Sequence, residues 1–391
     1  MRIIYCGCFR LPNLDAAAPR VLNNAKAFHA LGHNVKFISW GGKYRDSDLC
    51  EDGSYRIDGM EYIITNELDL RGSFLNRFLQ MLNRGSKTMT LLNKMPEKPN
   101  LIVMYNADFS FTRKMLNYCK MYNIKLVNDI TEWYDYNELH FWNILPNIFN
   151  MKNLQRKVRN KICISTYLGE YYKDSNNLLL PPLCDPSDAK WKATIEDCRV
   201  KPFSGVTLIY AGNPAKKDCI HSVINAVNTL ANEGNAIRFL ILGITREAYI
   251  RQYKQNLLEA SLNDNVIFLG RVSQDLIPAY YKKADFMVLL RKPTRKNMAG
   301  FPTKFAESMT SGVPVITNAT SDLAKYVVDG KTGFLVNGYD YESILYTLTN
   351  SVMIVRKADI DVMKSNVNRI KDSFDWHHYL NNINSFLNSL Y

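Results

Sequence analysis

Residues 299–318, AGFPTKFAESMTSGVPVITN, contain a tight turn, the start of a helix and two oppositely charged side chains. Gly300 and Pro302 favour a turn that leaves backbone N–H groups free where the helix begins. A helix N-terminus carries about half a positive charge and is a ready site for anions. Lys304 adds a full positive charge at the same place. This spacing predicts a binding site for a phosphate or diphosphate.

Glu307 lies three residues after Lys304 in the same helix. A phosphate would repel this carboxylate, but sugar hydroxyls beside the phosphate would donate hydrogen bonds to it. Glu307 shares a face with Ser308, whereas Phe305 and Met309 form the opposite, apolar face. The alternative is a simple ion pair between Glu307 and Lys304 at i, i+3. The spacing by itself leaves both interpretations open.

Short β-branched runs alternate with helical stretches along the chain, and these elements must position the charged side chains. We expect strands at 2–6, 35–39, 101–105, 125–128, 162–165, 207–211, 237–242, 266–269, 286–290 and 315–317. Strands that are buried on both faces and alternate with helices are typical of parallel sheets. The pattern predicts an α/β protein of two doubly wound domains, with a boundary near the proline- and aspartate-rich segment 178–198.

Two helices have recognisable ends. Pro19 is expected at the first position of a helix that Gly32 terminates. The last twenty residues are amphipathic, which predicts a packing helix or a strut that returns to the first domain.

Basic residues gather after the strands of the second half. In open parallel sheets, ligands bind outside the carboxyl ends of the strands. The loops that follow three expected strands carry Lys216, Lys217, Arg271, Arg291, Lys292, Arg295 and Lys296. The sequence therefore predicts a strongly cationic sheet edge beside the helix start at Lys304.

The composition restricts the class of protein. The 391 residues are 47% hydrophobic and 22% charged, as in globular domains. No apolar run approaches the roughly 20 residues of a membrane span, and the N-terminus lacks the features of a signal peptide, so we expect a cytoplasmic chain. The eight cysteines and six histidines show no pattern of metal ligands, and no metal is expected. The net charge of +12 fits a phosphorylated ligand, an anionic membrane or nucleic acid.

These segments resemble the retaining, nucleotide-sugar-dependent glycosyltransferases of family 4, which have the GT-B fold. The segments that carry the resemblance are GFPTKFAESMTSGVPVI (300–316), YAGNPAKKD (210–218), VIFLGRVS (266–273), VVDGKTGFLV (327–336), AAAPRVLNNAKAFHALGHNVKFI (16–38), VNDITEWYD (127–135) and CISTYLGEYY (163–172). The resemblance implies two Rossmann-like domains that face each other across a cleft. Residues 1–185 would bind the acceptor, residues 195–372 would bind the nucleotide sugar, and a helix at 373–391 would cross back to the first domain.

The resemblance also implies roles for residues of the second domain. Backbone N–H groups after Gly300, with Lys217, would hold the donor diphosphate, and Glu307 would bind the ribose hydroxyls. Arg271 lies where the family's backbone usually meets the nucleobase. The residues implied for donor binding are Gly212, Asn213, Lys216, Arg271, Gly300, Phe301, Pro302, Thr303, Lys304 and Ser308. The residues expected to act in the transfer step are Glu307, Lys217 and Arg291 of this domain, together with Glu132 of the first domain.

Two positions depart from the family's pattern. The Glu that usually precedes Glu307 by eight positions is Ala299 here, and Asn297 or Asn318 is the suggested substitute. The Arg that often follows the strand-end glycine is Asn213, so neighbouring basic residues would supply the missing charge. Both departures leave the identity of the donor sugar open.

Three residues of the first half are candidates for the acceptor side. Arg20 opens the helix after the first strand, and Asp129 and Glu132 follow another expected strand. Glu132 is placed to orient or deprotonate an acceptor hydroxyl. The alternative is that either acid only caps the turn before Trp133.

The expected activity is the transfer, with retention, of a sugar from a UDP- or GDP-sugar to a hydroxyl of a glycan or lipid-linked acceptor in bacterial surface polysaccharide synthesis. The expected catalytic effect is electrostatic: Lys217, Arg291 and the helix at 302–311 stabilise charge on the leaving diphosphate. No metal or other cofactor is expected. The alternatives are a nucleotide-sugar epimerase or hydrolase on the same fold and, more remotely, a basic nucleic-acid-binding protein. A nucleic-acid site would need a charged stripe with interleaved aromatic residues.

Two further segments, 71–94 and 141–161, mix aromatic, apolar and basic residues. Such segments suit peripheral contact with the inner, anionic face of the cytoplasmic membrane. They equally suit ordinary helices whose charged face meets water, and the sequence leaves the choice open.

Overall fold

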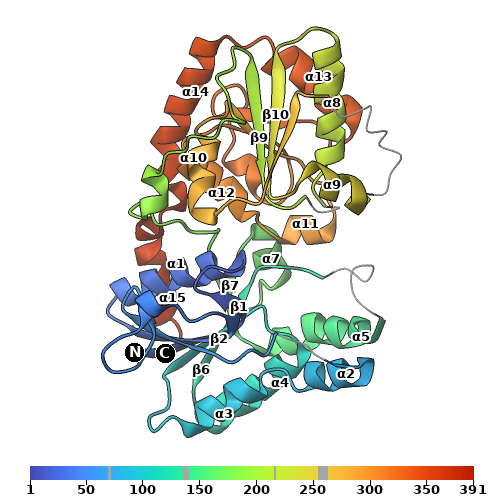
Figure 1. Ribbon diagram of the computed structural model, residues 1–391. Helices are drawn as coiled ribbons and strands as arrows, with labels where there is room; N and C mark the ends of the chain where they lie inside the picture. Colours follow the sequence, from blue (N-terminus) through green and yellow to red (C-terminus); the bar gives the residue numbers. More distant parts are fainter. Residues whose placement is uncertain (69–71, 135–140, 215–216, 254–262) are drawn as a thin grey trace. The chain divides into compact units, whose positions relative to one another are not determined.

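The computed structural model describes residues 1–68, 72–134, 141–214, 217–253 and 263–391. The chain forms two compact units, residues 1–184 with 376–391 and residues 185–375. The change of unit falls inside the segment 178–198. Each unit has a central sheet with helices packed on it (Figure 1). The expected architecture of two doubly wound α/β domains is confirmed.

The first unit is built on one eight-stranded sheet. Its strands are β1 (Arg2–Leu11), β2 (Asn34–Gly42), β3 (Arg56–Ile57), β4 (Met60–Ile64), β5 (Leu101–Tyr105), β6 (Lys125–Ile130), β7 (Asn160–Cys163) and β8 (Asn176–Leu179). The strand order is β3-β4-β2-β1-β5-β6-β7-β8, and only β3 pairs antiparallel with its neighbour. Strands β3, β4 and β8 were not predicted from the sequence. These strands lie toward the sheet edges and bury fewer side chains, so their apolar pattern is weak.

Helices cover both faces of this sheet. They are α1 (Ala17–Ala30), α2 (Phe74–Leu82), α3 (Ser86–Lys94), α4 (Phe109–Met121), α5 (Phe141–Phe149), α6 (Gln155–Lys157), α7 (Thr166–Tyr171) and α15 (Leu380–Asn388), with a π-helical turn at Asn150–Leu154 and 3₁₀ turns at Asp46–Asp48 and Trp376–Tyr379. Alternate residues of β1 enter two separate cores. Ile3 and Tyr5 pack with α1 and α15, whereas Ile4 and Cys6 pack with α3 and α4.

The start of α1 differs from the expectation. The helix begins at Ala17, so Pro19 is its third residue rather than its first. Asp15 Oδ1 accepts hydrogen bonds from the N–H groups of Ala17 at 3.1 Å and Ala18 at 2.9 Å. A side-chain oxygen that satisfies the first N–H groups lets a helix start earlier than a proline would indicate.

The second unit is built on a six-stranded, wholly parallel sheet. Its strands are β9 (Val206–Ala211), β10 (Ile237–Leu242), β11 (Val266–Gly270), β12 (Phe286–Leu289), β13 (Val315–Asn318) and β14 (Gly333–Val336). The order β11-β10-β9-β12-β13-β14 reverses direction between β9 and β12. Every residue of β9, β10, β12 and β13 is buried, as expected for strands covered on both faces.

Two groups of helices cover the second sheet. The helices are α8 (Ile220–Asn232), α9 (Arg246–Tyr253), α10 (Ile277–Tyr281), α11 (Arg295–Ala299), α12 (Thr303–Thr310), α13 (Tyr341–Thr347) and α14 (Lys357–Ile370), with 3₁₀ turns at Ala189–Lys192, Gln274–Leu276, Leu323–Lys325 and Lys371–Phe374 and a π-helical turn at Leu348–Val352. Helices α8 and α13 pack together, and α12 packs with α10 and α14. Figure 1 shows these two groups on opposite sides of β9 and β10. Among all described helices, none is both long and apolar enough to cross a bilayer.

The end of the chain differs in part from the single helix expected at 373–391. It consists of 3₁₀ turns followed by the nine-residue helix α15. The N–H of Trp376 donates to the carbonyl of Cys184 at 3.2 Å, and Ile383, Phe386 and Leu387 enter the core of the first unit. This last segment therefore belongs to the first unit.

Candidate functional site

The candidate site of the second unit lies where the strand order reverses, between β9 and β12. In doubly wound sheets the loops diverge at such a switch point and leave room for a ligand. Four polar side chains meet there. They are Tyr210 on β9, Asp218 in the following loop, Arg291 two residues after β12, and Lys304 in the first turn of α12.

Asp218 is the centre of this cluster. Its Oδ1 accepts a hydrogen bond from Arg291 Nε at 2.7 Å, and its Oδ2 accepts one from the Tyr210 hydroxyl at 2.5 Å. Lys304 Nζ lies 3.5 Å from Asp218 Oδ2, donates to the Tyr210 hydroxyl at 2.6 Å and stands 3.9 Å from the centre of its ring. The Lys304 side chain keeps 18% exposure, against 2% for Asp218. Lys304 is therefore the part of the cluster that an anion can reach.

The cluster carries more positive than negative charge. Burial lowers the pKa of Lys304 to about 8; the charge of Asp218 opposes this shift, and those of Arg291 and Lys217 reinforce it. Burial acts to raise the pKa of Asp218, but the charges of Lys304 and Arg291 outweigh it and hold that pKa below its usual value. One ionised carboxylate thus faces two close cations, with Lys217 as a third charge nearby. A bound anion would relieve their mutual repulsion.

Two strands of this site are followed by glycines, which have no side chain. Gly212 follows β9 with φ +132°, and a Cβ there would lie 3.0 Å from Lys304 Nζ. Gly243 follows β10 with φ +103°, and a Cβ there would lie 2.4 Å from the carbonyl carbon of Gly212. The ends of these two adjacent strands therefore carry no side chain, and a ligand can approach their backbone closely. The sequence analysis used Gly212 but missed Gly243, although a glycine directly after a buried strand was a readable signal.

The turn before α12 is built partly as expected. Pro302 is the N-cap residue and supplies no side-chain acceptor to the first N–H groups of the helix. Thr303 and Lys304 form the first turn. The N–H of Gly300 itself donates to the Lys296 carbonyl at 3.0 Å. Phe301 is 5% exposed and packs against the aromatic rings of the core, so its side chain anchors the turn.

Glu307 does not pair with Lys304, so the simple i, i+3 ion pair is excluded. Its Oε1 lies 3.4 Å from Lys190 Nζ, and both side chains are nearly one-fifth exposed. Ser308, expected at the donor site, is wholly buried and donates to the Val313 carbonyl at 3.1 Å. The helix turns Ser308 toward the core because it lies on the side of Phe305 and Met309, which are also fully buried.

The two suggested substitutes for a carboxylate at Ala299 are both engaged with backbone groups. Asn318 Oδ1 accepts from the N–H of Arg291 at 3.1 Å, and its Nδ2 donates to the carbonyl of Arg291 at 2.8 Å. Asn297 Nδ2 donates to the Lys292 carbonyl at 2.8 Å. Both are buried. These bonds give no support to a role of either residue in binding the donor sugar, and those of Asn318 position the backbone of Arg291.

The remaining predicted donor residues lie around the same sheet edge. Asn213 is exposed after β9, and Arg271 is exposed after β11. Lys217 precedes Asp218 and is close enough to lower the pKa of Lys304. Lys216 lies outside the described residues.

Arg20 and Asp129, expected on the acceptor side, lie inside the first unit. Arg20 Nη2 and Asp129 Oδ1 are 2.7 Å apart, and their side chains are 2% and 0% exposed. Arg20 also donates to the carbonyls of Leu180 and Pro181, and Asp129 accepts further hydrogen bonds from Tyr5 and Asn24. The buried pair ties α1 to β6 and to the chain after β8. Contact of either side chain with an acceptor is therefore excluded in this structure.

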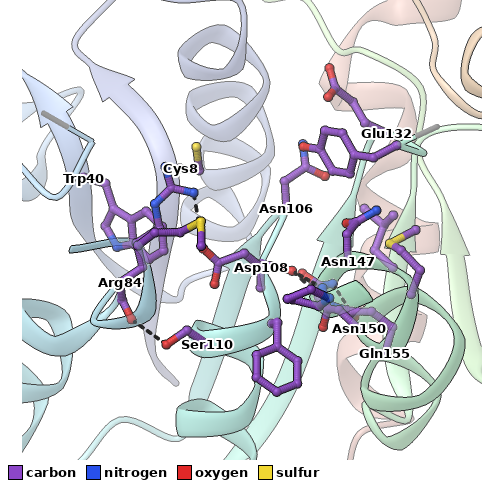
Figure 2. A pocket seen from close by; sticks show the side chains of 18 of the residues that line it. Cys8, Trp40, Arg84, Asn106, Asp108, Ser110, Glu132, Asn147, Asn150 and Gln155 are labelled. Carbon is purple, nitrogen blue, oxygen red and sulfur yellow. Dashed lines mark hydrogen bonds and ion pairs between the residues drawn. The ribbon is translucent and has the colours of Figure 1, made fainter. Parts of the chain in front are cut away.

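Glu132 lines a pocket of about 210 Å³ at the carboxyl edge of the first sheet, near the point where its strand order reverses between β1 and β5 (Figure 2). Trp40 and Arg84 stand on one side, and Asn150 and Gln155 stand on the other. Burial, together with the charge of Glu132 and a hydrogen bond to it, raises the pKa of Tyr134 well above its usual value. The sequence analysis identified Glu132 but not the pocket, whose wall comes from segments up to 147 residues apart.

Comparison with known proteins identifies the fold. Residues 200–350 match the model of the family described as Glycosyl transferases group 1. Over its whole length the chain superposes on sucrose-phosphate synthase from Thermosynechococcus elongatus, with a TM-score of 0.73, 15% identity and 99% of that chain covered. It also superposes on Anabaena HepE, solved in complex with UDP and glucose, with a TM-score of 0.70, 14% identity and 100% of both chains covered. The chain thus has the GT-B fold.

Relatives with closer sequences match part of the chain. The putative colanic acid biosynthesis glycosyltransferase WcaL of Salmonella typhimurium is 26% identical over 172 residues, which are 44% of this chain and 41% of that protein. The capsular polysaccharide biosynthesis glycosyltransferase CapM of Staphylococcus aureus is 25% identical over 181 residues, 46% of each chain. The matched regions span less than half the length of these relatives.

Proposed function

We propose that the protein is a glycosyltransferase of polysaccharide synthesis that moves a sugar, with retention, from a nucleoside-diphosphate sugar to a hydroxyl of a glycan or lipid-linked acceptor. The observation that carries this proposal is the cluster of Lys304, Arg291, Asp218 and Tyr210 at the switch point of the second sheet. The family match over residues 200–350 covers that cluster, and the UDP complex of HepE shares the fold. The names of WcaL and CapM support a polysaccharide setting.

Lys304, with the first turn of α12, is proposed to bind the diphosphate of the donor. Arg291 lies behind Lys304 and is fixed by Asp218 and Asn318, so its charge needs little reorganisation as the leaving phosphate becomes more negative. Lys217 adds a third positive charge. We assign charge neutralisation to these side chains rather than to a metal ion.

Glu307 is proposed to bind the hydroxyls of the donor's ribose. A carboxylate has about four lone-pair sites, so the contact of Oε1 with Lys190 leaves capacity for two hydroxyl donors. Lys190 would keep the carboxylate oriented. Arg271, exposed after β11, is the proposed contact near the nucleobase.

The nucleotide itself gives the first test of this proposal. We expect one of UDP, GDP, ADP or CMP to raise the thermal unfolding midpoint, because a ligand at about 100 times its dissociation constant stabilises the native state by about 2.7 kcal/mol. Glu307→Ala should abolish most of the rise, whereas Glu233→Ala, an exposed acid at the end of α8, should leave it intact. Differential scanning fluorimetry with each nucleotide measures both.

A flat response to all four nucleotides in the wild-type protein would remove the basis of the proposal. Once a donor is known, incubation without acceptor separates the alternatives. A rapid release of free nucleotide with an altered free sugar would instead indicate an epimerase or hydrolase.

The pKa of Lys304 predicts how nucleotide affinity depends on pH. The phosphates of a nucleoside diphosphate are largely ionised from pH 7 upward. A Lys304 with a pKa of about 8 is mostly protonated at pH 7 and largely neutral at pH 9. Affinity should therefore fall about tenfold between pH 7 and pH 9, since binding must first restore the proton. Isothermal titration with the nucleotide identified above measures the change. Lys304→Met should bind the nucleotide weakly, and its affinity should not fall between pH 7 and pH 9. An equal fall in this variant would assign the pH dependence to another group.

A further inference from the structure

Helix α2 is apolar but has no buried residue. Six of the nine side chains in its sequence, FLNRFLQML, are apolar, yet none is buried. Leu75, Leu79 and Leu82 repeat at i, i+4 and i+7 and are 62%, 47% and 44% exposed. A contiguous apolar stripe on the surface usually marks a contact with another apolar phase.

Helix α5 adds a second exposed apolar stripe. Leu145 and Phe149, at i and i+4, are 76% and 48% exposed. The Phe149 ring packs edge-on against Phe109, with 5.9 Å between ring centroids. Phe109 lines the pocket shown in Figure 2, and Pro146 of α5 and Leu82 of α2 line it as well. The two exposed stripes are therefore continuous with the wall of the pocket.

Part of the pocket wall is polar. Asn128, Asn150 and Gln155 are each at most 2% exposed. Asn128 Nδ2 donates to Gln155 Oε1 at 2.6 Å, and Asn150 Nδ2 donates to the Ala107 carbonyl at 2.9 Å. The Oδ1 atoms of Asn128 and Asn150 have no hydrogen-bond partner among the described residues. Amide side chains in a pocket wall suit a hydroxylated ligand, because they offer both donors and acceptors to its hydroxyls.

The surface around the stripes is basic. Residues 72–94 and 144–161 contain no Asp or Glu and carry Arg77, Arg84, Lys87, Lys94, Lys152, Arg156, Lys157, Arg159 and Lys161. Apart from Arg84 and Lys161, which are partly or fully buried, these cations are exposed. Exposed apolar side chains with basic residues around them match the interface of an anionic bilayer. A second copy of this chain on the same surface would bring like charges together.

We propose that the acceptor is lipid-linked: a hydroxylated head group enters the pocket of the first unit while its lipid stays in an anionic membrane against the stripes of α2 and α5. This inference rests on the proposed function, because it names the acceptor class of the same transfer. Glu132, which lines the pocket, is the residue assigned to the acceptor hydroxyl. The polar wall binds the head group, and the apolar wall and stripes cover the start of the lipid chain.

Vesicle flotation tests the membrane part of the proposal. The probes are vesicles of phosphatidylcholine with or without 30% phosphatidylglycerol (a fraction of roughly this size supplies the anionic surface charge). We expect the protein to float with the anionic vesicles and to be released by high salt. Leu75→Ser with Leu79→Ser should lower the vesicle affinity about tenfold or more, because two exposed leucines no longer enter the lipid. The matched control, Tyr346→Ser with Ile354→Ser, changes side chains of the second unit that are 70% and 71% exposed and should bind as wild type.

Hydrogen exchange with the same vesicles places the contact. We expect slower exchange in peptides that cover α2 and α5 and no change in α13. Absence of vesicle binding at low salt, an equal loss in the control pair, or protection confined to the second unit would overturn the proposal. A concentration-dependent dimer that the leucine variant disrupts would also overturn it, since the stripes would then cover each other.

The effect of a nucleotide on the unfolding midpoint distinguishes failure of the lipid-linked acceptor from failure of the proposed function. If the leucine variant and the wild type both respond to a nucleotide but the wild type ignores anionic vesicles, the lipid-linked acceptor is wrong and the transferase stands. If vesicles bind through α2 and no nucleotide binds, the proposed function fails, and this acceptor assignment fails with it.

Discussion

Lys304→Met is expected to lower the rate of sugar transfer by about 10²–10³-fold, the usual loss when one preorganised charge or donor at a leaving group is removed. Lys304 is the cation of the cluster with the most exposure, and Arg291 behind it is 7% exposed and already bonded to Asp218. Methionine has a similar length and no charge. Steady-state assays with the donor found in the nucleotide screen measure the loss.

The same substitution should leave the fold intact. Burial lowers the pKa of Lys304 to about 8, so its charged ammonium group is less stable in the folded protein than in water. Asp218 keeps its bonds to Arg291 and Tyr210 when Lys304 is gone. The unfolding midpoint of Lys304→Met should match that of the wild type within a few degrees, and Lys331→Met, an exposed lysine before β14, should keep full activity. Wild-type rates in Lys304→Met would show that the diphosphate binds elsewhere.

Asp129→Leu is expected to destabilise the first unit by about 3–5 kcal/mol, because it leaves the guanidinium of Arg20 buried without its counter-ion. The carboxylate accepts hydrogen bonds from Arg20, Tyr5 and Asn24, so its loss also leaves three buried groups short of a partner. Urea unfolding followed by a probe in the first unit measures the change.

The double variant Arg20→Met with Asp129→Leu is the control for this prediction. It removes both charges together, and replacing a whole buried pair with apolar side chains of similar size is often close to neutral. We therefore expect most of the stability to return. If Arg20→Met alone kept full stability but abolished transfer, the pair would act on the acceptor after all, as the sequence had indicated.

Local patterns in the sequence were enough to determine the fold class and the cationic edge of the second unit. The buried strands are runs of apolar residues, and the helix start at Pro302–Lys304 depends on neighbours in the chain. Since the carboxyl ends of parallel strands share one edge, basic loops after those strands had to lie near each other. Strands β3, β4 and β8 were not predicted because strands at or near a sheet edge bury too little to leave a clear apolar run. The four-residue edge strand β14 was missed as well, although three of its residues are buried.

Only the tertiary structure decided which charged side chains lie next to each other. Arg20 pairs with Asp129 across 109 residues, and Glu307 meets Lys190 across 117, although Lys304 was nearer in sequence. The pocket beside Glu132 likewise combines residues of β1, β2, α2, α4, β6 and α5. The sequence determined the apolar face of most helices and strands, because that depends on the local period of the backbone, although it placed Ser308 on the wrong face of α12. The partner of a polar side chain depends instead on strand order and on how the loops close, and these are properties of the whole sheet.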